Sequence, residues 1–236
     1  MRKPFRTIRR RILVVDVGGT HVKLLVTGMK EPIKIPSGPT LTPGMMIRKI
    51  KAALKNQPYD VVSIGCPGPI IHGQLFREPF NLGKGWMGFD FHKAFGKPVR
   101  IINDAAMQAL GSYTEGRLLF LGLGTGLGSA MVVNGIVEPM ELAHLPYRDG
   151  KTYEDYLGLR GLKRLGRKKW EQHVGKVVTQ LRDALEPDTV VIGGGNAKKL
   201  RTLPPGTILG SNENAFRGGF RMWDRAESKI ESPRSA

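Results

Sequence analysis

The sequence predicts an α/β fold made of two similar halves, because one strand–turn–strand pattern begins each half of the chain. The first copy, residues 12–27 (ILVVDVGGTHVKLLVT), is an apolar strand, a glycine turn and a second apolar strand. The second copy, residues 117–133 (RLLFLGLGTGLGSAMVV), repeats that order about a hundred residues later. Further apolar strands at residues 60–64, 97–102 and 189–192 are interspersed with helical patterns, as in α/β proteins.

The first turn suits a bound polyanion accompanied by a metal ion. Gly18 and Gly19 lack a Cβ, so phosphate oxygens can approach the backbone N–H groups of the turn. Asp16, at the end of the preceding strand, can hold Mg²⁺ or its water ligands. We therefore expect phosphate contacts from Asp16, Gly18, Gly19, Thr20 and Lys23. The alternative is an ordinary β-hairpin, in which Asp16 is only a turn residue.

Of two predicted strands in the first half, one ends in a proline-containing turn and the other ends in a pair of polar residues. Strand 60–64 leads into the turn G-C-P-G-P, and strand 97–102 ends in Asn103-Asp104. A hydroxyl that attacks a phosphoryl group needs a carboxylate at a strand end to orient it and take its proton, and Asp104 suits that role. Asn103 offers a donor and an acceptor for neighbouring hydroxyls. Because a helix is predicted next, Asp104 could instead be the N-cap of that helix.

The second glycine turn has the same chemistry as the first, and we expect phosphate contacts from Gly124, Thr125 and Gly126. Neither turn opens a helix and the sequence has no GxxxxGK loop, which argues against a Rossmann or P-loop site. Two facing phosphate loops of this kind resemble the actin/hexokinase-like superfamily. The resemblance implies a ribonuclease H-like fold that holds a phosphoryl donor between its two halves.

The motifs of the first half also resemble those of the ROK sugar kinases. That family has a G-x-P-G turn, matched by Gly65, Pro67 and Gly68, and then an N-L…W segment, matched within residues 81–86. The resemblance implies that Gly65 and Pro67 line a sugar pocket. It also implies that Asn103 contacts the sugar and that Asp104 is the catalytic base. The family's motif order extends over about residues 12–200.

The second half continues the resemblance with two further motifs. Glu141 and His144 match the family pattern E-x-G-H, with Ala143 in place of the glycine, and one helical turn could present both to one pocket. Residues 151–158 are close to the family's L-E-x-x-x-G element. The resemblance therefore implies sugar contacts from Glu141, His144 and Glu154, although Asp155 is adjacent to Glu154.

Many ROK members bind zinc through this histidine and a C-x-C-G-x-x-G-C cluster, but our sequence has no cysteine after Cys66. We therefore expect no zinc site. This departure and the short length make the chain similar to the polyphosphate-glucokinase branch of the family, whose members accept polyphosphate, ATP or both. Five cations lie within residues 163–169. They could follow a chain of phosphates, or form the solvated face of the amphipathic helix predicted for residues 170–185.

The last predicted strand, residues 189–192, leads into three glycines. In the superfamily such a turn carries the adenosine end of a nucleotide, with phosphates near a helix N-terminus, which implies this role for Gly194 and Gly195. A flexible connector is the alternative. A closing helix is predicted for residues 212–220. We divide the chain into a basic tail (1–11), an N-terminal lobe (12–109), a C-terminal lobe (110–225) and a disordered tail (226–236), with a cleft between the lobes.

Composition and charge limit the partners. One cysteine excludes an intrachain disulfide, and the lack of an apolar run of about 18 residues excludes a membrane span, so we expect a cytoplasmic protein. The net charge is +17, of which six positive charges lie in the first eleven residues. Such a surface attracts polyanions or is simply solvated. Without a helix-turn-helix, zinc-finger or RNP pattern, we expect no sequence-specific nucleic acid partner.

The ROK resemblance implies a Mg²⁺-dependent kinase, which we expect to be a homodimer. It would transfer a phosphoryl group from polyphosphate, ATP or both to the 6-hydroxyl of glucose or a related hexose. A strictly ATP-dependent hexokinase is the main alternative. A non-catalytic sugar sensor is another, but ROK repressors carry an N-terminal helix-turn-helix that eleven residues cannot form. A degenerate polyanion-binding module is a third, and the Asn103-Asp104 pair argues against it.

Overall fold

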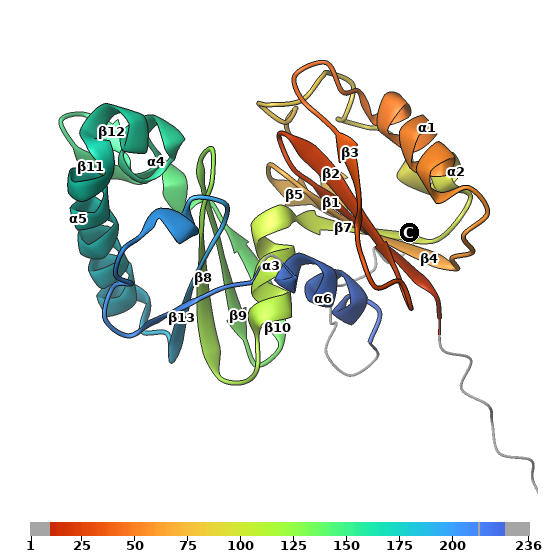
Figure 1. Ribbon diagram of the computed structural model, residues 1–236. Helices are drawn as coiled ribbons and strands as arrows, with labels where there is room; N and C mark the ends of the chain where they lie inside the picture. Colours follow the sequence, from red (N-terminus) through yellow and green to blue (C-terminus); the bar gives the residue numbers. More distant parts are fainter. Residues whose placement is uncertain (1–9, 212, 225–236) are drawn as a thin grey trace, which may run out of the picture.

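The computed structural model describes residues 10–211 and 213–224, which form two five-stranded sheets (Figure 1). The first sheet has the order β3-β2-β1-β4-β7 and the second has the order β10-β9-β8-β13-β14. The strands of the first sheet are β1 (Ile12–Val17), β2 (His21–Val26), β3 (Ile33–Pro36), β4 (Val61–Cys66) and β7 (Val99–Asn103). Those of the second are β8 (Arg117–Leu123), β9 (Leu127–Val133), β10 (Ile136–Met140), β13 (Thr189–Gly193) and β14 (Thr207–Leu209).

The two sheets share one topology, which confirms the predicted fold of two similar halves. In each sheet three consecutive strands pair antiparallel through the glycine hairpin, and two later strands add in parallel to the first strand. The buried central strands are rich in Val, Leu and Ile, as expected for strands covered on both faces. Two short hairpins, β5 (Ile70–Ile71) with β6 (Gln74–Leu75) and β11 (Pro146–Arg148) with β12 (Lys151–Thr152), extend from the sheets.

Helices cover the sheets in three layers (Figure 1). Helices α1 (Pro43–Leu54) and α2 (Phe91–Phe95) pack on the first sheet, and α5 (Leu159–Leu185), preceded by α4 (Tyr153–Leu157), packs on the second. Between the two sheets lie α3 (Asp104–Ser112) and α6 (Asn214–Arg221), in a shared apolar core. None of the described helices is long and apolar enough to cross a membrane.

The closing helix, α6, returns to the first sheet although it follows the second in the chain. Ser63 Oγ of β4 donates a hydrogen bond to Gly219 O (2.5 Å), and Trp223 Nε1 donates one to Ser63 Oγ (2.9 Å). The proposed lobe boundary at residues 109–110 remains a prediction. The basic tail, apart from Arg10 and Arg11, and the tail predicted as disordered lie outside the described residues.

Helix α5 begins earlier than the amphipathic pattern indicated. It starts at Leu159 and is interrupted at Gly166, whose φ of 73° and ψ of 161° are not helical. Of the side chains predicted to face the core from its longer part, Leu185 is partly buried and the others are buried, namely Trp170, Val174, Val177, Val178 and Leu181. The five cations of residues 163–169 therefore flank the break.

Candidate active site

The parallel pairing of β1, β4 and β7 brings several predicted site residues to one edge of the first sheet. In register, Asp16 lies opposite Gly65, and Cys66 lies opposite Asn103. Because all three strands end at this edge, Asp16 and the Asn103-Asp104 pair meet there although almost ninety residues separate them in the chain. Gly65 allows close packing, since a Cβ at this position would overlap the side chain of Met107.

Asn103, not Asp104, caps helix α3, so the N-cap alternative for Asp104 is wrong. Asn103 Oδ1 accepts hydrogen bonds from the N–H groups of Ala105 (2.9 Å) and Ala106 (3.2 Å). Its Nδ2 donates to the carbonyl of Gly68 (3.1 Å), in the turn after β4. Asn103 thus fixes the start of α3 against that turn. Asp104 is the first residue of the helix, and its carboxylate is left free of the capping role.

The surroundings of Asp104 favour its neutral form. Burial, and after it the nearby charge of Asp16, raise the pKa of Asp104 to about 6, although the backbone N–H of Ala105 acts in the opposite direction. Asp16 itself is buried at the sheet edge and pairs with Lys23 Nζ of β2 at 3.0 Å. Two acids thus lie close together with one cation beside them, an arrangement that can accept a proton near neutral pH.

The first glycine turn lies next to this pair. Gly18 N donates to His21 O (3.0 Å), and Ser37 Oγ donates to Gly18 O (2.6 Å), which together hold the turn in place. A Cβ at Gly19 would lie 3.5 Å from the Cβ of Asn81, so the N-L…W segment borders the turn. Thr20 is exposed beyond it.

The second glycine turn is held by its own backbone and by the loop after β13. Within it, Gly124 N donates to Gly126 O (3.1 Å). The loop after β13 closes over it, because Asn196 Nδ2 donates to Gly124 O (2.7 Å). Gly194 has a φ of 82°, and a Cβ there would crowd the backbone of Leu123. Gly194 and Gly195 therefore lie beside the second turn, followed by a short 3-10 helix, η2 (Ala197–Lys199), and not by a long helix.

Helix α3 connects Asp104 to this second turn. A Cβ at Gly128 of β9 would lie 2.9 Å from the Cβ of Ala105, the residue after Asp104. The carboxylate therefore lies where the parallel edge of one sheet meets the glycine hairpin of the other. This packing places the predicted base beside the hairpin that carries the second predicted phosphate-binding turn.

The structure distinguishes Glu154 from its neighbour Asp155. The Asp155 carboxylate belongs to a capping box, in which Thr152 N donates to Asp155 Oδ2 at 3.0 Å. Glu154 points instead at the second glycine turn, where Leu127 N donates to its Oε2 at 3.4 Å. A Cβ at Gly126 would overlap that same oxygen. Glu154 is thus the acid that faces the site.

Glu141 and His144 lie together, and their side chains are more exposed than those of Asp16 and Glu154. His144 Nε2 lies 3.5 Å from Glu141 Oε2, at the 3-10 helix η1 (Leu142–His144). Ala143, which replaces the glycine of the ROK pattern, is buried in the core. Burial raises the pKa of Glu141, and the charge of Glu154 also raises it. These interactions link Glu141 to Glu154 and, more weakly, to Asp104.

Three residues near the site were not singled out from the sequence. Asn196 holds the second turn, and its position directly after three glycines could have indicated this. Arg77, from the first half, lowers the pKa of Glu141 across the site. Arg160 pairs with Glu154 at 3.4 Å. No sequence pattern marks Arg77 or Arg160, because each reaches the site only through the tertiary arrangement.

In the cation cluster of residues 163–169, the two arginines have structural contacts and the three lysines have none among the described residues. Arg164 donates to Asp155 O (2.9 Å) and lies over the ring of Tyr156, and Arg167 pairs with Glu171 (3.1 Å). Lys163, Lys168 and Lys169 are exposed, and no hydrogen bond or ion pair joins them to the described residues. Among the described residues, no group of three or more His, Cys, Asp or Glu side chains could hold a metal ion.

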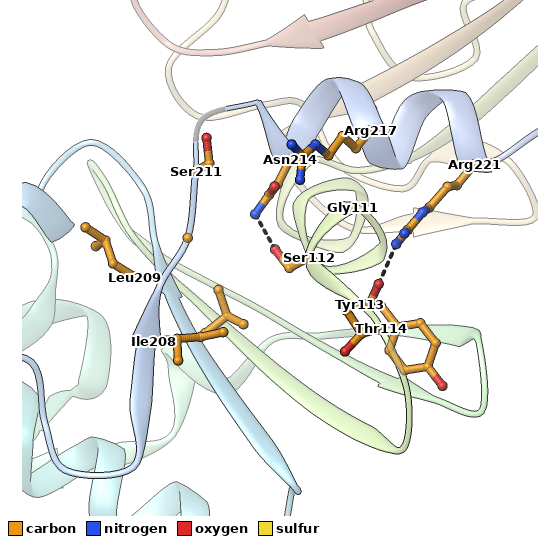
Figure 2. A pocket seen from close by; sticks show the side chains of 12 residues that line it. Gly111, Ser112, Tyr113, Thr114, Ile208, Leu209, Ser211, Asn214, Arg217 and Arg221 are labelled. Carbon is orange, nitrogen blue, oxygen red and sulfur yellow. Dashed lines mark hydrogen bonds between the residues drawn. The ribbon is translucent and has the colours of Figure 1, made fainter.

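A separate hollow of about 270 Å³ lies at the far end of α3 (Figure 2). It is bounded by the C-terminal end of α3, by β14 and by α6, and Asn214 Nδ2 donates to Ser112 Oγ (2.8 Å) at its wall. None of the predicted site residues lines it. The candidate active site is therefore the sheet edge at Asp104, one helix length away.

Two sheets of one topology, each with a glycine hairpin, and a cluster of acids at the edge of the first sheet define a hexokinase-like α/β fold. The model of the ROK family matches residues 12–138, which is more than half of the chain. The chain therefore belongs to the ROK family. This family membership agrees with the motif order predicted from the sequence.

Individual relatives are similar to the chain in sequence and in fold. A polyphosphate glucokinase of Mycobacterium tuberculosis is 28% identical over 222 residues, which covers 83% of this chain and 82% of that protein. The inorganic polyphosphate/ATP-glucomannokinase of Arthrobacter sp. strain KM is similar in structure, with a TM-score of 0.77, 24% identity, and coverage of 89% of this chain and 97% of that one. A ROK family glucokinase from Streptomyces griseus, solved with glucose and AMPPNP, gives a TM-score of 0.72 at 15% identity, over 90% and 98% of the two chains.

Proposed function

We propose that the chain is a sugar kinase that transfers a phosphoryl group from polyphosphate or ATP to the 6-hydroxyl of glucose or a related hexose. The observation that carries the proposal is Asp104. This residue is the first of α3 and lies at the sheet edge. Its carboxylate does not cap the helix, because Asn103 does, and its pKa is raised to about 6. The names of the relatives supply the substrate classes.

In the proposed reaction, the Asp104 carboxylate accepts the proton of the sugar hydroxyl as that oxygen attacks the terminal phosphorus of the donor. A new P–O bond forms to the sugar, and the bond to the rest of the donor breaks, with its electron pair leaving on the shortened donor. A base whose pKa lies near 6 is ionised at neutral pH and still basic enough to take the proton.

Sugar binding is assigned to the residues around this base. Gly65 and Pro67 would line the pocket with backbone, and Asn103, Glu141, His144 and Glu154 would bind hydroxyls. Glu154 and Glu141 interact with one another electrostatically, which is consistent with one shared pocket. A carboxylate can accept two hydroxyl hydrogens, so a few acids can orient a sugar closely.

Donor binding is assigned to the two glycine turns and the loop after β13. The residues are Gly18, Gly19, Thr20, Lys23, Gly124, Thr125, Gly126, Gly194 and Gly195. Asp16 would hold Mg²⁺ through water or phosphate oxygens, and the repulsion between the Asp16 and Asp104 carboxylates fits a cation there. When bound, Mg²⁺ neutralises charge that develops on the phosphates. We propose that the protein needs no zinc, acts in the cytoplasm as a homodimer, and binds no specific nucleic acid.

A phosphoryl-transfer assay tests the proposal. Glucose, mannose, fructose and N-acetylglucosamine would each be offered with ATP and with long-chain polyphosphate, in the presence of Mg²⁺. We expect a sugar 6-phosphate from glucose with at least one donor. Transfer from ATP alone would favour the ATP-dependent hexokinase. If no sugar is phosphorylated with either donor, the kinase assignment is wrong.

A further inference from the structure

Arg160 lies beside the second glycine turn, at the beginning of α5. The first residue of that helix, Leu159, donates its N–H to Thr125 O at 3.1 Å. The preceding Gly158 packs so closely on the turn that a Cβ there would lie 2.8 Å from the same oxygen. Arg160 is the next residue along the helix, so its guanidinium starts within side-chain reach of Thr125 and Gly126.

The present partners of Arg160 hold it loosely. Its Nη2 lies 3.4 Å from Glu154 Oε1 and 3.7 Å from Asp155 Oδ1, and its side chain is 73% exposed. Ion pairs this long and this exposed contribute little to stability, because water screens them. The guanidinium can therefore exchange these carboxylates for a stronger anion at small cost.

The helix places further cations on the same face. Lys163 and Arg164 follow Arg160 by three and four residues, which is the spacing of neighbours on a helix surface. Arg164 is held by the carbonyl of Asp155 and by the ring of Tyr156, so it serves the local structure. Lys163 is exposed and has no partner among the described residues. Arg160 and Lys163 are thus the two available cations nearest the start of α5.

We propose that Arg160 contacts the phosphoryl donor. When polyphosphate binds, the Arg160 guanidinium would move away from Glu154 and bind the phosphates that lie beyond the one transferred. Lys163 would then contact the chain one turn further along α5. A planar guanidinium can bind two phosphate oxygens at once, which suits Arg at the position nearest the reacting end. This inference rests on the proposed kinase function and makes Arg160 a determinant of preference for polyphosphate over ATP.

The test compares Arg160→Gln and Arg160→Lys with Lys51→Gln, which removes the same charge from the exposed side of α1. The KM values for long-chain polyphosphate, ATP and glucose would be measured for each, together with equilibrium binding of polyphosphate in the absence of sugar. Loss of one charge-assisted contact should raise the polyphosphate KM and its dissociation constant about tenfold in Arg160→Gln. Arg160→Lys should be intermediate, and Lys51→Gln should match the wild type.

The glucose KM separates this role from a positioning role. If Arg160 only orients Glu154, Arg160→Gln will raise the glucose KM and leave polyphosphate binding unchanged, which overturns the proposal. Equal polyphosphate binding in all variants overturns it as well, as does a wild-type enzyme that uses ATP but not polyphosphate. Lack of transfer from any donor in the wild type would instead defeat the kinase assignment itself. Thermal unfolding of each variant checks that the fold is retained.

Discussion

At the scale of single residues, Asp104 is held in conditions that oppose its charge. Burial and the neighbouring Asp16 raise its pKa to about 6. Replacement by Asn should lower kcat at least about 10²-fold, because a positioned general base is lost. In the wild type, kcat/KM should fall about tenfold per pH unit below pH 6, as the free enzyme's base becomes protonated. Steady-state kinetics over a pH series measures both effects, and near-wild-type turnover of the variant would remove Asp104 from the mechanism.

The same carboxyl should cost stability at neutral pH. Its folded pKa of about 6 lies above the ordinary value of 3.8, so the folded chain binds the proton more tightly than the unfolded chain. The cost is absent below about pH 4 and complete above about pH 6. Asp104→Asn should therefore raise the free energy of unfolding by up to about 3 kcal/mol at pH 8, and by much less at pH 4. Urea unfolding at both pH values tests this, and a gain independent of pH would contradict the electrostatic cause.

At the scale of elements, α3 and α6 approach each other through glycines. A Cβ at Gly218 would overlap the carbonyl oxygen of Met107, and one at Gly111 would overlap that of Asn214. Gly218→Ala should therefore lower the free energy of unfolding by about 1–3 kcal/mol or more, because the helices must separate. Since α3 carries Asp104, kcat should fall as well.

A half-buried glycine of α5 with open space beside its Cα provides the matched control. Nothing lies within 4 Å of a Cβ built at Gly175, so Gly175→Ala should stabilise the chain by about 0.5–1 kcal/mol through helix propensity. Denaturant unfolding of the two variants should thus give shifts of opposite sign. Equal changes in the free energy of unfolding would mean that the close contact of α3 and α6 does not stabilise the fold.

At the scale of the whole molecule, the net charge of +17 bears on the donor. Binding of a phosphate chain releases counterions, so polyphosphate affinity should fall steeply with salt. ATP carries only a triphosphate that Mg²⁺ partly neutralises. We expect the polyphosphate KM to rise several-fold more than the ATP KM between low and physiological salt. Replacing Lys163, Lys168 and Lys169 with Gln should reduce this difference and leave ATP turnover unchanged, because none of the three has a partner among the described residues. If both donors show the same salt dependence, these cations do not bind polyphosphate and only form the solvated face of the helix.

Local patterns in the sequence were sufficient for the fold class and for placing Asp104, the proposed base, at the end of a strand. The repeated strand–glycine turn–strand units predicted two equivalent sheets, because hydrophobic periodicity and turn chemistry are encoded by neighbouring residues. The Asn103-Asp104 pair at a strand end likewise pointed to the sheet edge. The proposed roles of these residues remain predictions until the variants are measured.

The remaining choices depended on contacts between distant segments. From the sequence alone, either of two adjacent polar residues could cap a helix or face the site. Only the packing showed that Asn103 caps α3 and that Asp155 belongs to the capping box of α4. Asp104 and Glu154 are therefore the residues that face the site. The return of α6 to the first sheet depends on glycine contacts with α3 more than a hundred residues earlier. The raised pKa of Asp104 also arises from burial and from the charge of Asp16, on another strand. Desolvation and close packing act through space, so a linear pattern of residues does not contain them.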